Sequence, residues 1–120
     1  MLDKRNRLTK RGSYNFVYKK GETHSLNNLR ITFVRSKGLA RVGISVPNSV
    51  GKAVVRNKVR RRIRAAMRGI VPNLRASQIV ISAKSGADTL TYAQIESTLR
   101  ELLFKSGLYE KKEDNGGLRS

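Results

Sequence analysis

Alternation of apolar and polar residues predicts strands in the first half of the chain. In the segment Arg41 to Val46, apolar residues alternate with arginine, glycine and serine, which is the period of a strand with one buried face. The segment Leu29 to Arg35 is rich in β-branched and aromatic residues, and a Ser-Lys-Gly turn signal separates the two segments. Pro47 ends the second strand because proline cannot donate a ladder hydrogen bond. A further, almost wholly apolar strand is predicted over 78–83.

Apolar residues that recur every three or four positions predict three helices. The first covers 13–20 and begins at Ser13, a residue type favoured as an N-cap. The second covers 54–70. The third covers 91–106, where a Thr-x-x-Gln capping box precedes an apolar stripe. Helix, strands, helix, strand and helix in this order predict an α+β fold in which one small sheet packs against three helices.

The chain length fits a single domain. Its 120 residues, 38% of them hydrophobic, suffice for one core. No internal repeat or proline-rich linker divides them. We expect one domain over 1–109, with a flexible lead-in over 1–8 and a disordered polar tail over 110–120.

We find no membrane-spanning segment and no secretory signal in this sequence. No apolar run approaches the roughly 18 residues of a membrane span, and the N-terminal charges are not followed by the apolar stretch of a secretory signal. The chain has no cysteine, which fits a reducing compartment. These features predict a cytoplasmic protein without a membrane partner.

The charge is large and unevenly distributed. Lys and Arg total 26 against 8 Asp and Glu, a formal net charge of +18. Residues 1–84 carry 21 of the basic and 2 of the acidic side chains, whereas 85–120 carry 5 and 6. The basic residues cluster in 4–20 and 52–68. Because such an excess works against compactness, we interpret the clusters as a binding surface for a polyanion, most simply a nucleic acid.

Few residues could carry out catalysis. His24 is the single histidine and cysteine is absent, so neither a histidine metal cage nor a cysteine nucleophile can be built from one chain. The basic part of the chain holds only the carboxylates of Asp3 and Glu22, fewer than two-metal phosphodiester cleavage needs. We therefore expect no catalytic residue and no metal site in this chain.

The helix over 54–70 has two chemically different faces. Its apolar residues fall within an arc of about 120°, which predicts that this face packs on the sheet. The opposite side is cationic without an acidic residue, although like charges at this spacing destabilise a helix. A merely solvated face would normally mix charges, so we interpret this one as a phosphate-binding surface, to which guanidinium groups are well suited. The candidate residues of this helix are Arg56, Asn57, Lys58, Arg60, Arg61, Arg64 and Arg68. Lys58 and Arg60 fall on the flanks of this face, and Arg56 falls inside the apolar arc but near the helix start, where its side chain can reach water.

Aromatic residues form a second candidate group. Tyr14 and Tyr18 are four residues apart, so they share one face of the first helix, whereas Phe16 points elsewhere and is expected in the core. On the following strand, Phe33 shares one side with Ile31. Two interpretations stay open from these patterns: the aromatic side chains belong to the core, or they form a stacking platform for unpaired bases.

The segment GKAVVRNKVRRRIR (Gly51–Arg64), preceded by RVGISVPNSV (Arg41–Val50), resembles the signature of the bacterial ribonuclease P protein component. In that family a strand leads into an arginine-rich helix with an Arg-Asn-Arg motif. The segments Lys4–Gly21 and Gln78–Tyr109 resemble the first helix and the last strand and helix of the family. The resemblance covers nearly the whole chain apart from the tail.

This resemblance implies a fold and a function. The fold is an α-β-β-β-α-β-α sandwich with a left-handed parallel crossover, an exception to the usual rule. The function is that of a subunit of ribonuclease P, which binds the catalytic RNA subunit and the precursor tRNA and assists removal of the 5′ leader. Mg²⁺ bound by the RNA would supply the chemistry, and no obligate protein partner is implied. The alternatives are a structural, ribosomal-type RNA-binding protein and an autonomous nuclease.

The resemblance also implies roles for individual residues. The arginine-rich helix would face the catalytic RNA, with Lys58 in place of the second arginine of the motif. Where family members often carry a lysine pair, this chain has Asn48 and Ser49, so the contacts of that pair are not carried over to this chain. The cleft for the single-stranded leader would comprise Tyr14, Tyr18, Phe33 and Lys84.

Overall fold

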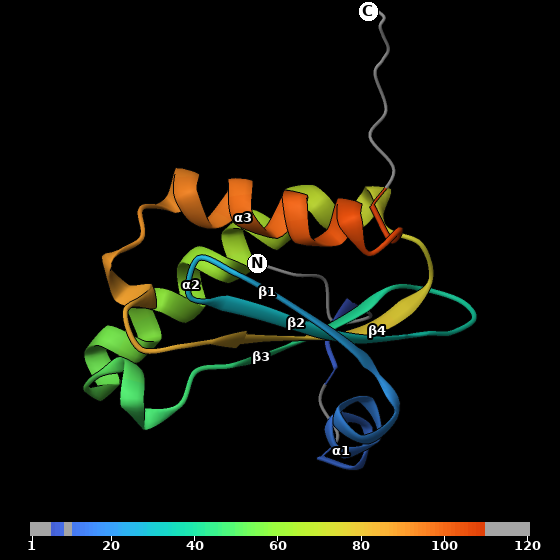
Figure 1. The fold of residues 1–120 in the computed structure, drawn as a ribbon, viewed down its shortest axis with the longest axis horizontal. Coiled ribbons are helices and arrows are strands. Elements are labelled where there is room, and N and C mark those ends of the chain that lie inside the picture. Colours follow the sequence, from blue (N-terminus) through green and yellow to red (C-terminus); the bar gives the residue numbers. More distant parts are fainter. Residues whose placement is uncertain (1–5, 9–10, 110–120) are drawn as a thin grey trace, which may run out of the picture.

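The computed structural model describes residues 6–8 and 11–109 (Figure 1). Its helices are α1 (Arg11–Lys20), α2 (Ala53–Ile70) and α3 (Tyr92–Lys105), and its strands are β1 (Glu22–Leu26), β2 (Leu29–Arg35), β3 (Arg41–Ser45) and β4 (Ser77–Ala83). Three short 3-10 turns, η2 (Asn48–Val50), η3 (Val71–Asn73) and η4 (Ala87–Thr89), flank α2 and α3. No helix in this part of the chain has the length and hydropathy of a membrane span.

The four strands form one mixed sheet in the order β1-β2-β4-β3. β2 pairs antiparallel with both β1 and β4, whereas β3 and β4 are parallel. Parallel neighbours need a crossover connection, and α2 provides it. The α+β class, the single sheet and the α-β-β-β-α-β-α order are therefore confirmed. The left-handed sense of the crossover stays a prediction.

The sheet separates two unequal layers (Figure 1). α2 and α3 lie together on one face, and α1 lies alone on the other. The main core fills the first layer, where alternate residues of β2 and β4, such as Ile31 and Ile81, meet the apolar face of α2. On the other face, Val17 of α1 is completely buried against Val80 of β4.

The predicted helices α2 and α3 form almost at their expected bounds. α2 begins one residue earlier than predicted and buries its expected apolar stripe, which includes Val59, Ile63 and Met67. α3 begins with the predicted capping box. The Thr91 hydroxyl oxygen accepts a hydrogen bond from the backbone N–H of Gln94, and the Gln94 side-chain oxygen accepts one from the backbone N–H of Thr91. Local side-chain chemistry is thus sufficient to fix the start of α3.

Three details of the first 26 residues correct the sequence predictions. α1 begins at Arg11 rather than at Ser13, which lies inside the helix. Phe16 is 51% exposed instead of buried, because Val17 occupies the face of α1 that packs on the sheet. Glu22–Leu26 forms the edge strand β1, which the sequence pattern did not place because only alternate residues are partly buried and none is fully buried.

Residues 6–8, which precede α1, pack against the edge of the sheet. The side chain of Asn6 donates to the carbonyl oxygen of Ala40 at 2.8 Å, and the Leu8 N–H donates to the carbonyl oxygen of Val42 at 2.9 Å. Leu8 is buried with Val17 under the sheet. This segment extends the free edge of β3, and the flexible lead-in over 1–8 stays a prediction. The predicted tail, 110–120, lies outside the described residues.

Candidate nucleic-acid interface

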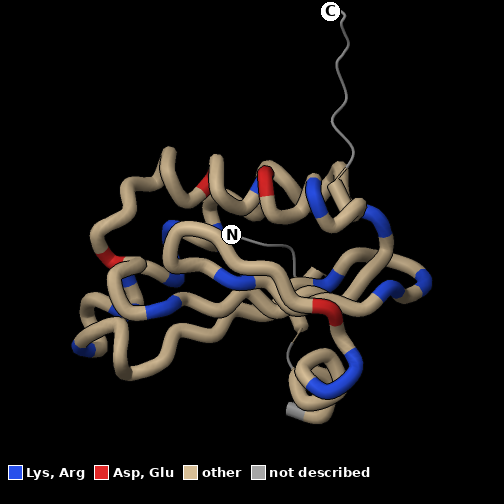
Figure 2. The backbone as a smooth tube through the Cα atoms, in the orientation of Figure 1, with Lys and Arg blue, Asp and Glu red and all other residues tan. Residues whose placement is uncertain are grey.

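α2 presents a cationic face on the side opposite its buried stripe. Seven basic side chains and no acidic ones occur within Ala53–Ile70, and Figure 2 shows the basic positions along the backbone. Lys58, Arg61 and Arg68 are exposed, while Arg60 and Arg64 are partly buried. The structure therefore places the predicted arginines on one surface of the helix, as the helical periodicity of the sequence indicated.

This cationic face is not neutralised by carboxylates of the described residues. The ion pairs within 6–8 and 11–109 join His24 to Glu22 on β1, and Arg100 to Glu96 and Lys105 to Glu101 on α3. Because unpaired cations repel one another, this arrangement costs stability unless an anion binds there.

Two polar contacts organise the N-terminal half of the face. Arg60 donates to the side-chain oxygen of Asn57 at 2.9 Å, so these two predicted residues act together. Arg56 donates through Nε to the carbonyl oxygen of Gly51 at 3.1 Å, which ties the helix to the preceding loop. Both bonds leave several guanidinium donors available, since arginine has five N–H groups.

Arg62 has a different role from its neighbours. It lies to the side of the cationic face and donates to the carbonyl oxygens of Asp88, at 3.3 Å, and Leu90, at 2.9 Å. These oxygens belong to η4 and the residue after it, so Arg62 fastens α2 to the segment that leads into α3.

Replacing Arg62 by alanine is expected to lower the free energy of unfolding by about 1–2 kcal/mol, because two carbonyl oxygens lose a charged donor. The measurement is chemical denaturation. Arg61→Ala is the matched control: its side chain is exposed, so its free energy of unfolding should change by only about 0.5 kcal/mol. Equal destabilisation by the two variants would contradict this separation of roles.

The second predicted surface lies on α1. Tyr14 and Tyr18 lie one turn apart, as expected from their spacing, but their environments differ. Tyr18 is 46% exposed, whereas Tyr14 is partly buried and packs against Gly43 of β3. Burial raises the pKa of Tyr14 above its usual value, although a hydrogen bond with the Ile44 backbone and the nearby Arg64 guanidinium act in the opposite direction. Tyr18 therefore offers a ring for stacking, whereas the hydroxyl end of Tyr14 packs against β3.

Lys84 lies on the same face of the sheet as α1. Its ammonium group is 3.4 Å from the hydroxyl oxygen of Ser25 on β1. Ser25 pairs with Arg30, Arg30 with Ser82, and Ser82 with Ser45. A polar row thus crosses all four strands beside α1. Sequence reasoning missed Arg30, although its alternation with buried Leu29 and Ile31 placed it on this face.

Phe33 does not belong to this surface, and its assignment to the leader cleft is wrong. It is only 5% exposed and lies in the main core. The strand register explains the result: Phe33 pairs with Ile79 and shares the face of Ile31, which is turned towards α2 and α3. Thr32, the preceding residue of β2, pairs with Val80 and faces α1 instead. His24 stacks on Phe33 with ring centroids 6.0 Å apart, which further encloses the ring.

The two surfaces meet at the free edge of β3. A cavity of about 200 Å³ lies there, lined by the 6–8 segment, Tyr14, β3 and Arg64.

Asn48 and Ser49 are exposed in η2, just before α2. Among the described residues, no three His, Asp or Glu side chains come together in a way that could hold a metal ion. The arrangement suits recognition of a polyanion by two adjoining surfaces.

Comparisons with known proteins give one consistent result. The family model described as Ribonuclease P matches residues 2–107. The ribonuclease P protein component of Finegoldia magna is 35% identical over 106 residues, covering 88% of this chain and 94% of the relative. The ribonuclease P protein component of Clostridium acetobutylicum is 36% identical over 116 residues, with 91% and 97% covered.

Solved structures agree with the sequence relatives. A structure of the Staphylococcus aureus RNase P protein superimposes with a TM-score of 0.81 at 27% identity, covering 88% of this chain and 98% of the other. The RNase P protein of Thermotoga maritima, at 23% identity and a TM-score of 0.75, shows the same fold. The chain therefore belongs to the bacterial ribonuclease P protein components, which are subunits of the endoribonuclease that matures the 5′ end of tRNA.

Proposed function

We propose that this chain binds the catalytic RNA through α2 and the 5′ leader of precursor tRNA through α1 and the adjoining sheet. The observation that carries the first part is the face of α2, where arginines have no carboxylate partner within the described residues. Guanidinium groups make bidentate contacts with phosphate oxygens, so a folded RNA would relieve the repulsion among them.

The second part rests on the chemistry beside α1. An exposed ring at Tyr18, the ammonium of Lys84 and the guanidinium of Arg30 adjoin a polar row of the sheet. Rings stack on any base, and cations follow the backbone, so such a surface binds a single strand with little sequence preference. Mature tRNA lacks the leader. Binding of the leader would therefore favour the precursor over the product.

The protein would position RNA, and the RNA would carry out hydrolysis. Mg²⁺ bound by the catalytic RNA would supply the chemistry of hydrolysis. The described residues bring no three carboxylates together, which supports assigning these ions to the RNA. Neutralisation of phosphates by α2 should lower the Mg²⁺ concentration that the complex needs. The proposal needs no obligate protein partner and places the reaction in the cytoplasm.

The test is reconstitution at low Mg²⁺. The full chain is mixed with precursor tRNA, with and without a catalytic RNA, and release of the leader is measured. Cleavage is expected only when protein and catalytic RNA are both present. Cleavage by the protein alone would identify an autonomous nuclease. A protein that binds RNA but does not alter cleavage would fit a structural RNA-binding role and would contradict the proposal.

Replacing Tyr18 by alanine is expected to weaken binding of precursor tRNA to the holoenzyme about tenfold, because one stacked base is worth roughly 1–3 kcal/mol. Binding of mature tRNA should not change, since it has no leader. Phe104→Ala is the matched control, because Phe104 is an exposed aromatic residue on α3, 59% exposed. An equal loss for precursor and mature tRNA would argue against a leader contact at Tyr18.

A further inference from the structure

The outer side of α3 carries a regular row of large side chains. Their spacing of four residues places them in one ridge along the helix, and they are Tyr92, Glu96, Arg100 and Phe104. Tyr92 is 43% exposed and Phe104 is 59% exposed. α3 packs on α2, β1 and β2 through its other side, where its buried residues lie. Exposed aromatic rings are typical of protein interfaces, so this ridge is a candidate docking surface.

The charge of α3 differs from that of the rest of the chain. α3 holds two glutamates and two basic residues, which balance, whereas the whole chain has a formal net charge of +18. In the middle of the ridge, Arg100 donates through Nη2 to Glu96 Oε2 at 3.2 Å. RNA binding draws on an excess of positive charge, which α3 lacks. The ridge therefore suits a protein partner better than a nucleic acid.

The order of the residues along the ridge makes it complementary to itself. Two copies of α3 can meet about a two-fold axis that passes between Glu96 and Arg100. Each carboxylate then faces a guanidinium group of the other copy, and each Tyr92 faces the Phe104 of the other copy. A two-fold contact requires this reciprocity. Ridges of residues spaced by four pack together in the commonest class of helix contact, with axes that cross at about 50°.

The shape of this side of α3 supports the same pairing. The row beside the ridge contains the small exposed residues Ala93 and Ser97, so a second ridge can approach closely. A hollow of about 450 Å³ at the C-terminal end of the ridge is lined by Arg100, Glu101, Phe104 and Tyr109. Arg100 donates to the hydroxyl of Tyr109 and lies 5.5 Å from the centre of its ring, which fixes one wall. In the antiparallel pairing, the Tyr92 ring of each copy meets the hollow of the other.

We propose that this chain forms a weak two-fold homodimer in which the α3 ridges of two copies pack antiparallel. A contact through one helix buries less than the roughly 1,200 Å² of a stable complex, so the dissociation constant should be on the order of 100 μM. α1 lies on the other face of the sheet (Figure 1), so the dimer leaves the surface beside α1 free. The proposal goes beyond the proposed function and does not depend on it.

The test is sedimentation velocity on the full chain with two charge reversals, Glu96→Arg and Arg100→Glu. A salt concentration of about 0.3 M screens the net positive charge of the chain. Alone, each variant places like charges of the two copies against each other, so its dissociation constant should rise at least about tenfold. In an equal mixture the two variants should associate at least as tightly as the unsubstituted chain, because every cation then faces a carboxylate.

Glu101→Arg and Lys105→Glu are the matched control variants. They change the same charges in the other ion pair of α3, in which Lys105 lies 3.0 Å from Glu101. Positions 101 and 105 do not face each other across the proposed axis, so mixing these two variants should not tighten association. If both mixtures behave alike, the proposed register is wrong. A chain that stays monomeric at several times the expected dissociation constant, alone and in the first mixture, would overturn the proposal and leave the ridge to a different protein.

The aromatic part of the contact is tested without changing any charge. Tyr92→Ala removes the ring that would meet the hollow and should raise the dissociation constant of the dimer about tenfold. Tyr18→Ala is its control, because Tyr18 is 46% exposed but lies on α1; this variant should associate like the unsubstituted chain. Both side chains are exposed, so both variants should keep the circular dichroism spectrum of the folded chain. Equal weakening by the two variants would contradict an interface on α3.

Discussion

Replacing Gly21 by alanine is expected to lower the free energy of unfolding by about 3 kcal/mol. Gly21 joins α1 to β1, and its added Cβ would lie 2.4 Å from the carbonyl oxygen of Val17 and 2.9 Å from that of Phe33. Both oxygen atoms belong to the backbone, so a side-chain rotation cannot remove the clash with the added Cβ. α1 must instead shift against the sheet. A loss of this size is a large part of the 5–15 kcal/mol typical of a domain.

Gly12→Ala is the matched control for this prediction. Gly12 also lies in the α1 region, but a Cβ there would meet no atom within 4 Å. Alanine should stabilise the chain by about 0.5 kcal/mol, because it restricts the unfolded state. Thermal and chemical unfolding of both variants give the comparison. Similar free energies of unfolding for the two variants would show that α1 is not fixed by the close contacts at Gly21.

The same contacts have a consequence for RNA binding. Tyr14 and Tyr18 are held at the sheet by the docking of α1, which depends on Val17 and on the turn at Gly21. A displaced α1 would carry both rings away from Lys84 and Arg30. A stability change at a glycine that contacts no RNA should therefore also reduce discrimination between precursor and mature tRNA.

The cationic face of α2 could be predicted because it depends on a single helix. Helical periodicity alone separates Val59 and Ile63 from Arg61 and Arg68, and the structure confirms this division. The capping box at Thr91 could be predicted for a similar reason. Features set by residues within one or two turns of each other need no knowledge of the rest of the fold.

Features set by tertiary packing were predicted less well. β1 went unplaced because an edge strand with the sequence ETHSL lacks an apolar face, although Asn27 and Asn28 mark the hairpin that follows it. Both asparagines have positive φ, 48° and 66°, as a two-residue hairpin turn requires. The Phe33 error had another cause. Alternation correctly placed Phe33 beside Ile31, but it could not show which face of the sheet α1 would cover.

The place where the two surfaces meet could not be predicted from sequence patterns either. Tyr14, Gly43 and Arg64 are far apart in the chain and meet only because α1 and α2 approach the same strand. One signal was available: a glycine inside the alternating strand Arg41–Ser45 often marks a place where another group approaches the backbone closely. It indicates that something packs at Gly43, but not that a tyrosine does.

Replacing Arg61, Arg64 and Arg68 together by alanine is expected to weaken binding to the catalytic RNA by roughly fifty- to two-hundredfold near 0.15 M salt. Each phosphate contact contributes about 0.7–0.9 to the slope of log K against log salt, so three lost contacts should flatten that slope by about 2–3. Affinity is measured across a range of salt concentrations. None of the three side chains lies in the core, so the variant should remain folded by circular dichroism.

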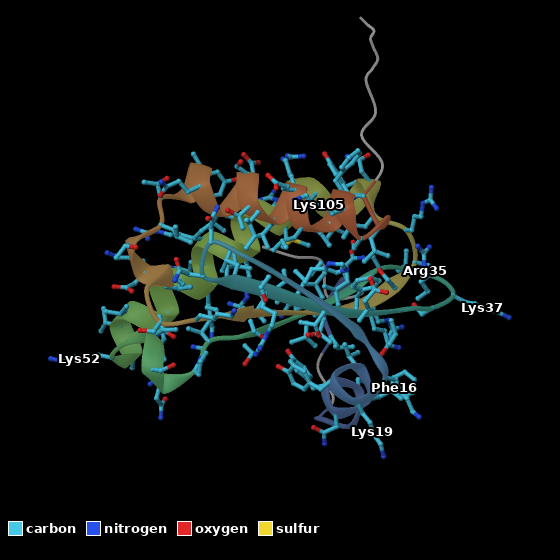
Figure 3. The ribbon with its side chains drawn as sticks, viewed as in Figure 1. Phe16, Lys19, Arg35, Lys37, Lys52 and Lys105 are labelled. Atoms are coloured by element: carbon cyan, nitrogen blue, oxygen red, sulfur yellow. The ribbon has the colours of Figure 1, made fainter. Side chains whose placement is uncertain are left out.

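A second triple variant tests whether location or total charge is responsible. Arg35, Lys37 and Lys105, labelled in Figure 3, lie on the end of β2, the turn after it and α3, and not on α2. Their replacement by alanine removes the same three charges from the chain. If a local surface on α2 binds the RNA, this control should reduce affinity only a fewfold and leave the slope nearly unchanged, because distant charges are screened within about 10 Å. Equal slopes for the two triple variants would mean that the net charge of +18 acts as a diffuse attraction, and that the geometry of α2 carries no specific contact.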